Sequence, residues 1–381
     1  MMNEITRCSR CILPSSLKGI IFNEEGVCNH CLSFEKNFAG WDAIEERKNK
    51  EFEKILAKAK SLKRPYDCLV PLSGGKDSTY ALYLTTKVYG LRTLAISLDN
   101  SYLTSPAKEN IKNALSHSNA DHIFYTLNRK NTSELFKAFV INTGDFCNAC
   151  MRGINYSIEF ASKAFKIPLV IKGSGRRVQY VSQIKETSSL NTASYFENVI
   201  KGSPAREQFK HFSRNKHSLE FQKIVGGISD ILKIPRSSLM RFVPQHIGMY
   251  DYIYKPYPEI IKILKNQMGW SDGSGKAEHL DCELHDAPFY MNTIKIPNIT
   301  KNTFYYSGLI RQGIMSREEA LKKETEDMFN NSRPLELEEF LAKNNISFEN
   351  YKDFVLNSDK SQFEPKIQKL ARNIYHKFRK F

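Results

Sequence analysis

Short apolar runs alternate with amphipathic, helix-like segments between residues 66 and 172. Four apolar runs of strand length predict strands at 67–72, 92–98, 122–127 and 167–172. Apolar residues repeat at helical spacing in the segments between them, at about 78–88, 106–116 and 151–165. Because strands that alternate with helices form a parallel sheet covered on both faces, the pattern predicts an α/β fold.

The flanking segments are expected to be mainly helical. A charged amphipathic helix is predicted at 41–63, and Ser316 with Glu319 forms a capping box for a helix ending near Met328. Residues 180–265 are expected to be helical with loops. These patterns divide the chain into a Cys-rich unit at 1–40, a linking helix at 41–65, an α/β domain at 66–265, a motif-bearing continuation at 266–330 and C-terminal helices at 331–381.

Composition and charge limit the possible cellular environments and binding partners of the protein. The 381 residues are 41% hydrophobic and 12% aromatic, which suits a folded, core-forming protein. The formal net charge of +15 fits nucleic acid, an anionic membrane surface, a phosphorylated substrate or a lysine-rich solvated surface. No apolar run reaches the ~18 residues of a membrane span, and the N-terminus lacks the apolar core of a secretion signal. We therefore expect a cytoplasmic protein without membrane insertion, for which RNA remains a candidate partner.

A glycine-rich loop, Ser73-Gly74-Gly75-Lys76-Asp77-Ser78, joins the first predicted strand to the next helix. Glycines let the backbone approach phosphate oxygens, and a helix N-terminus presents N–H groups with a positive dipole. The two serines add hydroxyl donors, and Lys76 adds a positive charge. Because the loop lacks the Gly-x-x-x-x-Gly-Lys-Ser/Thr spacing of ordinary ATPases, it predicts a phosphate-binding site of a different kind.

Further polar and glycine residues follow the carboxyl ends of neighbouring strands. Asp99 and Asn100 follow the second strand, and Gly173 and Gly175 follow the fourth. Ligands of parallel sheets bind at this edge, so these four residues are candidate nucleotide-binding residues. An Asx turn that leaves the strand explains the Asp-Asn pair equally well. The basic pair Arg176–Arg177 is either a phosphate contact or surface charge.

Four N-terminal cysteines form two Cys-x-x-Cys knuckles, Cys8/Cys11 and Cys28/Cys31, separated by 16 residues. This spacing lies within the range of structural zinc ribbons, in which four thiolates surround the ion as a tetrahedron. Such a closed site organises structure and leaves no open position for chemistry. The sequence therefore predicts an N-terminal zinc ribbon that holds a structural Zn²⁺.

A second cysteine set comprises Cys147, Cys150 and the distant Cys282. Three thiolates suit a [4Fe–4S] cluster with one open iron, or a zinc ion with His279 or His285 as its fourth ligand. A redox-active Cys147–Cys150 pair is a further interpretation, as is simple packing of unrelated cysteines. The sequence leaves these four interpretations open.

The phosphate loop resembles the loop of the PP-loop ATP pyrophosphatases, which has the form Ser-Gly-Gly-x-Asp-Ser. That group belongs to the adenine nucleotide alpha hydrolase superfamily, whose fold is HUP-like. Its members cleave ATP between the α and β phosphates and leave an adenylate on a substrate oxygen. The resemblance implies that the loop binds the departing pyrophosphate and that Asp77 helps to bind the accompanying Mg²⁺. It also implies catalytic roles for Lys76 and Ser78.

Several motifs together resemble the N-acetyl sugar amidotransferases of lipopolysaccharide and nonulosonic-acid pathways. They are the second knuckle within 22–31, the 73–78 loop, Leu98-Asp99-Asn100, Gly269-Trp270 and the stretch 313–321. The resemblance covers most of residues 5–325. It implies that ATP adenylates the acetamido oxygen of a sugar and that ammonia then displaces AMP, leaving an acetamidino group. It also implies a separate glutaminase and a channel-forming partner as the source of ammonia.

The Cys147-x-x-Cys150 motif before the fourth strand departs from the amidotransferase pattern. With the later Cys282, it is similar to PP-loop sulfurtransferases, including those that thiolate transfer RNA with the help of an iron–sulfur cluster. The resemblance therefore leaves either nitrogen or sulfur as the transferred atom, on a small molecule or on RNA. A zinc-ribbon nucleic-acid-binding protein with a vestigial loop is a third interpretation, based on the basic charge and the ribbon.

Overall fold

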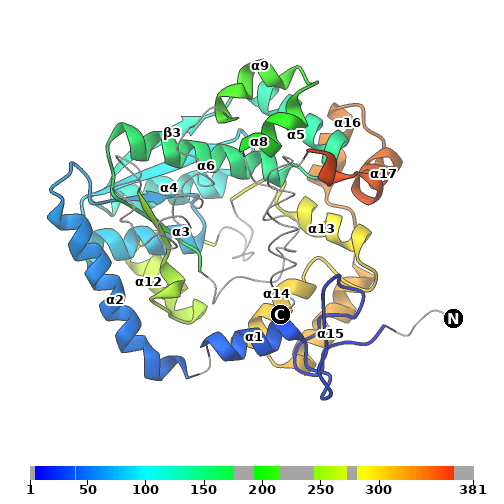
Figure 1. Cartoon of the computed structure of the whole chain (residues 1–381), viewed down its shortest axis with the longest axis horizontal. Coiled ribbons are helices and arrows are strands. Elements are labelled where there is room, and N and C mark those ends of the chain that lie inside the picture. The colour runs from blue at the N-terminus through cyan, green and yellow to red at the C-terminus, as the bar shows by residue number, and fades with distance from the viewer. Residues whose placement is uncertain are drawn as a thin grey trace, which may run out of the picture.

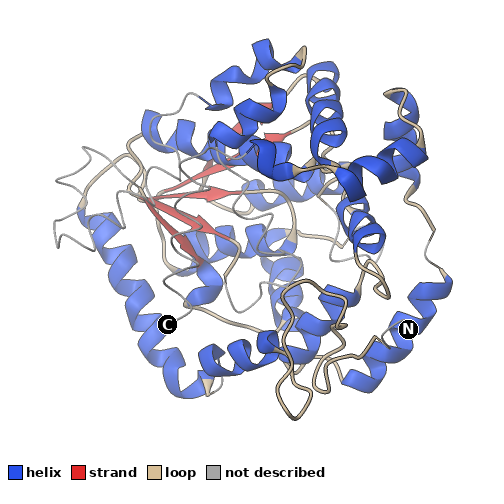
Figure 2. Cartoon of the chain, turned by 45° about the vertical axis from the view of Figure 1, so that its right-hand side comes forward, coloured by secondary structure: helices blue, strands red, loops and turns tan. Residues whose placement is uncertain are grey.

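Five parallel strands form one sheet in the order β3-β2-β1-β4-β5. The structure is a computed structural model that describes residues 5–38, 40–175, 193–213, 244–272, 281–330 and 332–363. The strands are Cys68–Pro71 (β1), Thr93–Asp99 (β2), Asp121–Thr126 (β3), Leu169–Lys172 (β4) and Gln245–Gly248 (β5). Figures 1 and 2 show helices packed around them. The predicted α/β class with a parallel sheet is confirmed.

Helices make up most of the remaining described chain. The α-helices are Asn29–Phe38 (α1), Trp41–Ser61 (α2), Lys76–Tyr83 (α3), Ser105–Ser116 (α4), Arg129–Thr143 (α5), Cys147–Ala164 (α6), Ala193–Ile200 (α8), Ala205–Phe209 (α9), Tyr257–Met268 (α12), Asp286–Lys295 (α13), Thr303–Arg311 (α14), Arg317–Phe329 (α15), Leu335–Lys343 (α16) and Phe348–Asn357 (α17). Short π or 3-10 turns are Leu84–Val88 (η1), Lys210–Ser213 (η2), Met249–Asp251 (η3) and Lys360–Phe363 (η4). Within the described segments, none of these helices combines the length and apolar character that a bilayer crossing requires.

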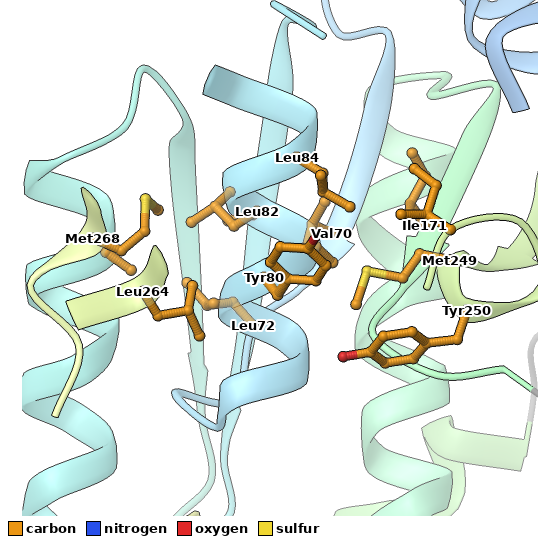
Figure 3. Close-up of a cluster of buried hydrophobic side chains, with 14 of the residues drawn as sticks. Val70, Leu72, Tyr80, Leu82, Leu84, Ile171, Met249, Tyr250, Leu264 and Met268 are labelled. Carbon is orange, nitrogen blue, oxygen red and sulfur yellow. The ribbon is translucent and has the colours of Figure 1, made fainter. Parts of the chain in front are cut away.

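Alternate residues of the central strands pack into two separate hydrophobic layers. Val70 of β1 and Ile171 of β4 belong to the layer that contains Tyr80 of α3 and Leu264 of α12 (Figure 3). Leu69, next to Val70 on β1, belongs instead to the layer on the α6 side of the sheet. This alternation with a period of two is why both faces of the sheet are buried under helices.

The strand order creates a crevice at one edge of the sheet. β1 lies at the centre, with β2 and then β3 on one side and β4 and then β5 on the other. The chain therefore leaves β1 and β4 toward opposite sides, and the carboxyl ends of these strands form a topological switch point, where open α/β sheets bind ligands. The 73–78 loop lies at this point, because it connects β1 to α3.

Two further hydrophobic clusters attach the outer segments to the sheet domain. Helices α5, α8, α13, α16 and α17 contribute to one cluster, in which Phe139, Phe196 and Tyr351 are buried. The four N-terminal cysteines share the other cluster with Ile296 and Phe304. Accordingly, the dark-blue N-terminal unit lies beside α14 and α15 in Figure 1. The C-terminal helices thus pack in both clusters, one beside the sheet and one around the N-terminal cysteines.

The structure corrects three element predictions. The expectation of helix and loop for 180–265 is wrong for Gln245–Gly248, which pairs with β4 and has too few apolar residues for the sequence to reveal a strand. α6 begins at Cys147 instead of near 151, and α3 begins at Lys76 instead of Ser78. Helix α5 was not among the predicted elements. Cys147 and Cys150 therefore lie in the first turn of α6, and Lys76 lies in the first turn of α3.

Some predicted features fall outside the described residues. They are the basic pair Arg176–Arg177, the candidate ligand His279 and the C-terminal segment after 363. Within the described part of the tail, α16 and α17 confirm the prediction that this region is helical.

Candidate active site at the carboxyl edge of the sheet

Two backbone positions at the phosphate site, one in the loop and one at the end of β4, accommodate only glycine. Gly74 has φ of 82°, and a Cβ added there would lie 2.3 Å from the carbonyl oxygen of Ala107 on α4. A Cβ on Gly173, at the end of β4, would lie 2.4 Å from the carbonyl oxygen of Asp77. Both separations are far below a normal contact, so the loop is clamped between α4 and the end of β4.

Distant residues fix the orientation of the loop backbone. The indole nitrogen of Trp270 donates to the carbonyl oxygen of Gly74 at 2.9 Å, and Asn110 Nδ2 donates to the same oxygen at 3.2 Å. The Asn110 amide also binds both the N–H and the carbonyl of Ser271, at 2.9 and 2.8 Å. The Gly269-Trp270 motif therefore acts structurally, by holding the loop against α4.

The charged side chains of the loop have specific partners. Lys76 is buried, with its Nζ 4.2 Å from the ring centre of Tyr257 and 3.6 Å from Asp77 Oδ2. The hydroxyl of Tyr250 donates to Asp77 Oδ1 at 2.6 Å. Burial, together with Asp77, raises the pKa of Tyr250, so the phenol remains protonated as a donor. A lysine and a carboxylate are thus held side by side at the N-terminus of α3.

The loop opens into a cavity of about 450 Å³, within the usual range for small-molecule sites. One wall is polar and consists of the loop and the end of β4. The other is apolar and consists of side chains from β1, β2 and α6. The lining residues are Pro71, Leu72, Ser73, Gly75, Lys76, Asp77, Ser78, Ile96, Leu98, Met151, Ile154, Asn155, Ser157, Ile158, Lys172, Gly173, Ser174, Asp281 and His285. The arrangement offers positive charge and N–H donors beside a surface suited to a planar apolar group.

The predicted nucleotide-binding residues fall into two groups. Ser73, Gly75, Lys76, Asp77, Ser78 and Gly173 line the cavity, whereas Gly74, Gly175, Asp99 and Asn100 do not. Asp99 Oδ2 lies 3.2 Å from Lys108 Nζ, and Asn100 Nδ2 donates to Cys150 Sγ at 3.2 Å. Gly175 is required for a different reason, because a Cβ there would lie 2.6 Å from the Tyr250 Cβ.

Sequence reasoning assigned no role at the phosphate site to several cavity residues. Lys172 ends β4, and Asn155 lies on α6. Asp281 and His285 come from the polar stretch before α13, which the sequence marked as motif-like without assigning it to this site. Their position in the lining of the cavity depends on tertiary packing, which local sequence patterns do not report.

The four N-terminal cysteines come together as predicted. The Sγ atoms of Cys8, Cys11, Cys28 and Cys31 all lie within 4.8 Å of one another, and the four residues are buried. The Cys11 and Cys28 sulfurs are 3.8 Å apart. The backbone N–H groups of Cys11 and Cys28 donate to Cys8 Sγ at 3.4 and 3.2 Å, which favours its thiolate form. Because a tetrahedral zinc with ~2.3 Å Zn–S bonds places its sulfurs at similar separations, these residues fit Zn²⁺.

The cysteine unit is joined to the C-terminal region by two arginines. Arg317 Nε donates to the carbonyl oxygens of Cys8 and Cys11 at 3.1 and 3.0 Å. Arg7 Nη1 lies 2.8 Å from Glu324 Oε2, and its other terminal nitrogen donates to the carbonyl of Asn298 at 2.8 Å. A metal held by the four thiolates would therefore stabilise the contact between the N-terminal knuckles and α15.

The second cysteine set also comes together, but less compactly. Cys147 and Cys150 on α6 pack, with Cys282, against the same hydrophobic cluster. Within the described segments, the N-terminal cysteines are the one group of three or more acidic, histidine or cysteine ligands that all lie within 4.8 Å of one another. Burial raises the pKa of Cys150 to about 11 and also raises the pKa of Cys147 and Cys282, which disfavours free thiolates. A cluster, a zinc ion and a redox pair at these three thiols stay predictions.

Comparison with known proteins gives matches that each cover part of the chain. Residues 289–379 match a family model described as LPS biosynthesis protein WbpG-like, C-terminal domain. This match begins in α13 and includes α14 to α17, so it covers the helices beside the cysteine unit and leaves out the phosphate loop. A stretch of 172 residues is 34% identical to an uncharacterized protein of Methanocaldococcus jannaschii. That alignment covers 44% of this chain and 58% of the relative's length.

Proposed function

We propose that this protein is an ATP-dependent amidotransferase of surface-polysaccharide biosynthesis. It adenylates the acetamido oxygen of an N-acetyl sugar, releases pyrophosphate, and replaces the oxygen with nitrogen derived from ammonia. The observation that carries the proposal is the 73–78 loop, which opens into a cavity with Lys76 and Asp77 at the N-terminus of α3. The match of residues 289–379 to the LPS biosynthesis family model supports the sugar pathway.

The loop chemistry suits a departing pyrophosphate. The N-terminus of α3 presents N–H groups and a positive dipole, which attract phosphate oxygens. The buried Lys76 and the nearby Lys172 add positive charge on the same cavity wall. Asp77 is the loop carboxylate available to the Mg²⁺ that accompanies polyphosphate, and the Tyr250 hydroxyl fixes its orientation.

Adenylation converts the acetamido oxygen into a group that a nucleophile can displace. An amide oxygen is a very poor leaving group, whereas an AMP ester is a good one. The protein then contributes chiefly by positioning the two substrates and neutralising the phosphate charge. In this proposal the apolar wall of Leu72, Ile96 and Ile158 receives the adenine.

The N-terminal cysteines have a structural role in this proposal. Zn²⁺ bound by four thiolates has no open coordination position, and the site is linked through Arg317 to α15, not to the cavity. A separate glutaminase and a channel-forming partner supply ammonia in the cell, so ammonium salts replace them in the test below.

An isotope experiment tests the proposal. A nucleotide-linked N-acetyl sugar labelled with ¹⁸O in the acetamido carbonyl is incubated with ATP, Mg²⁺ and ammonium chloride. We expect pyrophosphate, an acetamidino sugar and AMP that carries the label, because the C–O bond breaks and the P–O bond persists. Asp77→Asn, as a matched control, abolishes all three products. Unlabelled AMP, or no sugar-dependent pyrophosphate release with any acetamido sugar, overturns the proposal.

A further inference from the structure

A second carboxylate lies beside the phosphate loop in the lining of the cavity. Asp281 Oδ2 lies 4.0 Å from the position that a Cβ on Gly75 would occupy. Asp281 lines the same cavity as the loop, from a segment more than 200 residues away in the chain. A carboxylate in this place repels phosphate oxygens and other anions, so its partner during the reaction carries positive charge or an exchangeable proton.

The surrounding contacts hold Asp281 in a defined place. The N–H of Glu283 donates to the Tyr102 carbonyl at 2.8 Å. Leu284 is buried in the hydrophobic cluster to which α5, α8, α13, α16 and α17 contribute. His285 follows one turn later, with its Nδ1 3.4 Å from Asp281 Oδ1. Both side chains face the cavity, so the histidine positions the carboxylate beside the loop.

The neighbourhood of Asp281 also disfavours an anionic nucleophile. The Asp281 carboxylate repels any anion that enters the cavity beside the loop. Hydrosulfide or a persulfide anion would meet the same repulsion. Ammonium is attracted to this place, and ammonia loses a proton once it has attacked a carbon.

We propose that Asp281, positioned by His285, receives the nitrogen nucleophile and takes the proton that the nitrogen loses. This inference rests on the proposed function. The nitrogen lone pair forms the C–N bond to the adenylated acetamido carbon. The C–O bond to AMP breaks, and its electron pair leaves with AMP. One proton passes from the attached nitrogen to the Asp281 carboxylate and then to water, leaving the amidine.

Two half-reactions separate this role from a role in ATP binding. Sugar-dependent exchange of pyrophosphate into ATP requires adenylation but no ammonium, whereas amidine formation requires both. For Asp281→Asn we expect exchange within about threefold of wild type and amidine formation lower by about 100-fold or more. Hydroxylamine, whose adduct is more acidic and loses its proton to water more readily, restores part of the product formation in this variant. His285→Gln lowers amidine formation by about tenfold and leaves exchange intact.

Control variants keep the outcomes distinguishable. Glu283→Gln changes a neighbouring carboxylate that lies 3.2 Å from Arg129 Nη2 and outside the cavity, so both half-reactions stay near wild type. Asp281→Glu keeps the charge and recovers part of the amidine rate, which excludes a purely structural loss. Equal loss of exchange and amidine formation in Asp281→Asn overturns the inference, as does unchanged amidine formation. Absence of exchange in the wild type overturns the proposed function itself.

Discussion

The hydroxyl of Tyr250 donates a 2.6 Å hydrogen bond to Asp77 Oδ1, across 173 positions of the chain. Tyr250 lies in η3, directly after the edge strand β5, and its ring is buried in the layer that also contains Tyr80 (Figure 3). Because burial keeps the phenol protonated, this contact holds one carboxylate oxygen in place and leaves the other beside Lys76. The edge strand thus contributes directly to the phosphate site.

Tyr250→Phe removes this hydrogen bond without emptying the ring's place in the core. We expect the melting temperature to change little and sugar-dependent pyrophosphate exchange to fall about tenfold, the effect of losing one hydrogen bond to a charged group. Tyr66→Phe is the matched control, because Tyr66 donates to Asp121 at 2.7 Å in an exposed place away from the cavity. Equal exchange rates in the two variants would contradict an orienting role for Tyr250.

Replacing Gly74 or Gly173 by alanine tests whether the close packing of the backbone at these two glycines is needed for nucleotide binding. Gly74→Ala places a methyl group 2.3 Å from the Ala107 carbonyl, at a residue with positive φ, and Gly173→Ala places one 2.4 Å from the Asp77 carbonyl. The loop must shift in both variants, so we expect ATP affinity, measured by calorimetry, to fall at least about tenfold. Gly202→Ala is the control, since a Cβ there meets nothing within 4 Å. Wild-type affinity in both loop variants would show that the loop does not bind the nucleotide.

The sequence predicted the parts of the site that local patterns encode. The 73–78 loop was recognisable because its strand, turn and helix are consecutive, and the four N-terminal cysteines because their spacing alone identifies a ligand set. Trp270 illustrates what remained hidden. Its indole holds the Gly74 carbonyl across 196 positions, and no local periodicity reports such a contact. The same holds for Asp281, which tertiary packing brings to the cavity.

Two further differences have other causes. β5 contains one apolar residue, Ile247, so it lacks the apolar run that predicted the equally short strands β1 and β4. Its strand character comes from pairing with β4, a tertiary interaction. Asp99 and Asn100 were expected at the nucleotide because they end a strand at the correct edge. Their side chains cap the following turn, where Ser101 N–H binds Asp99 and Tyr102 N–H binds Asn100, and they do not line the cavity, so a nucleotide contact by these residues stays a prediction.

Loss of one N-terminal cysteine should affect stability before chemistry. Cys8→Ser removes a ligand from the four-thiolate group and weakens the contact that Arg317 makes with the first knuckle. We expect metal analysis to find one zinc per wild-type chain and less than half as much in the variant, with a melting temperature several degrees lower.

A buried cysteine outside the group provides the control. Cys68 lies in the core on β1, and Cys68→Ala should keep its full zinc content despite some loss of stability. Zinc retained in Cys8→Ser, or a variant that is fully stable but inactive, would contradict a structural metal.

His246 makes the fold sensitive to acid. It lies on β5, and burial, with help from Lys172, lowers its pKa from 6.5 to about 3. In the unfolded chain the imidazole titrates at its ordinary pKa, so below about pH 6.5 the unfolded state binds a proton that the folded state excludes. The free energy of unfolding therefore falls as the pH drops through this range, by ~2 kcal/mol at about pH 5, and the loss is complete only near pH 3.

Urea unfolding of His246→Leu at about pH 8 and about pH 5 measures this contribution directly. Other titrating groups contribute equally to wild type and variant, so the wild type should lose ~2 kcal/mol more than His246→Leu between the two pH values. His117 is exposed, and His117→Leu controls for the replacement of a histidine by leucine outside the sheet. If His246→Leu loses as much stability in acid as the wild type does, the imidazole is already charged in the folded protein, and the burial of β5 against β4 is looser than its contacts indicate.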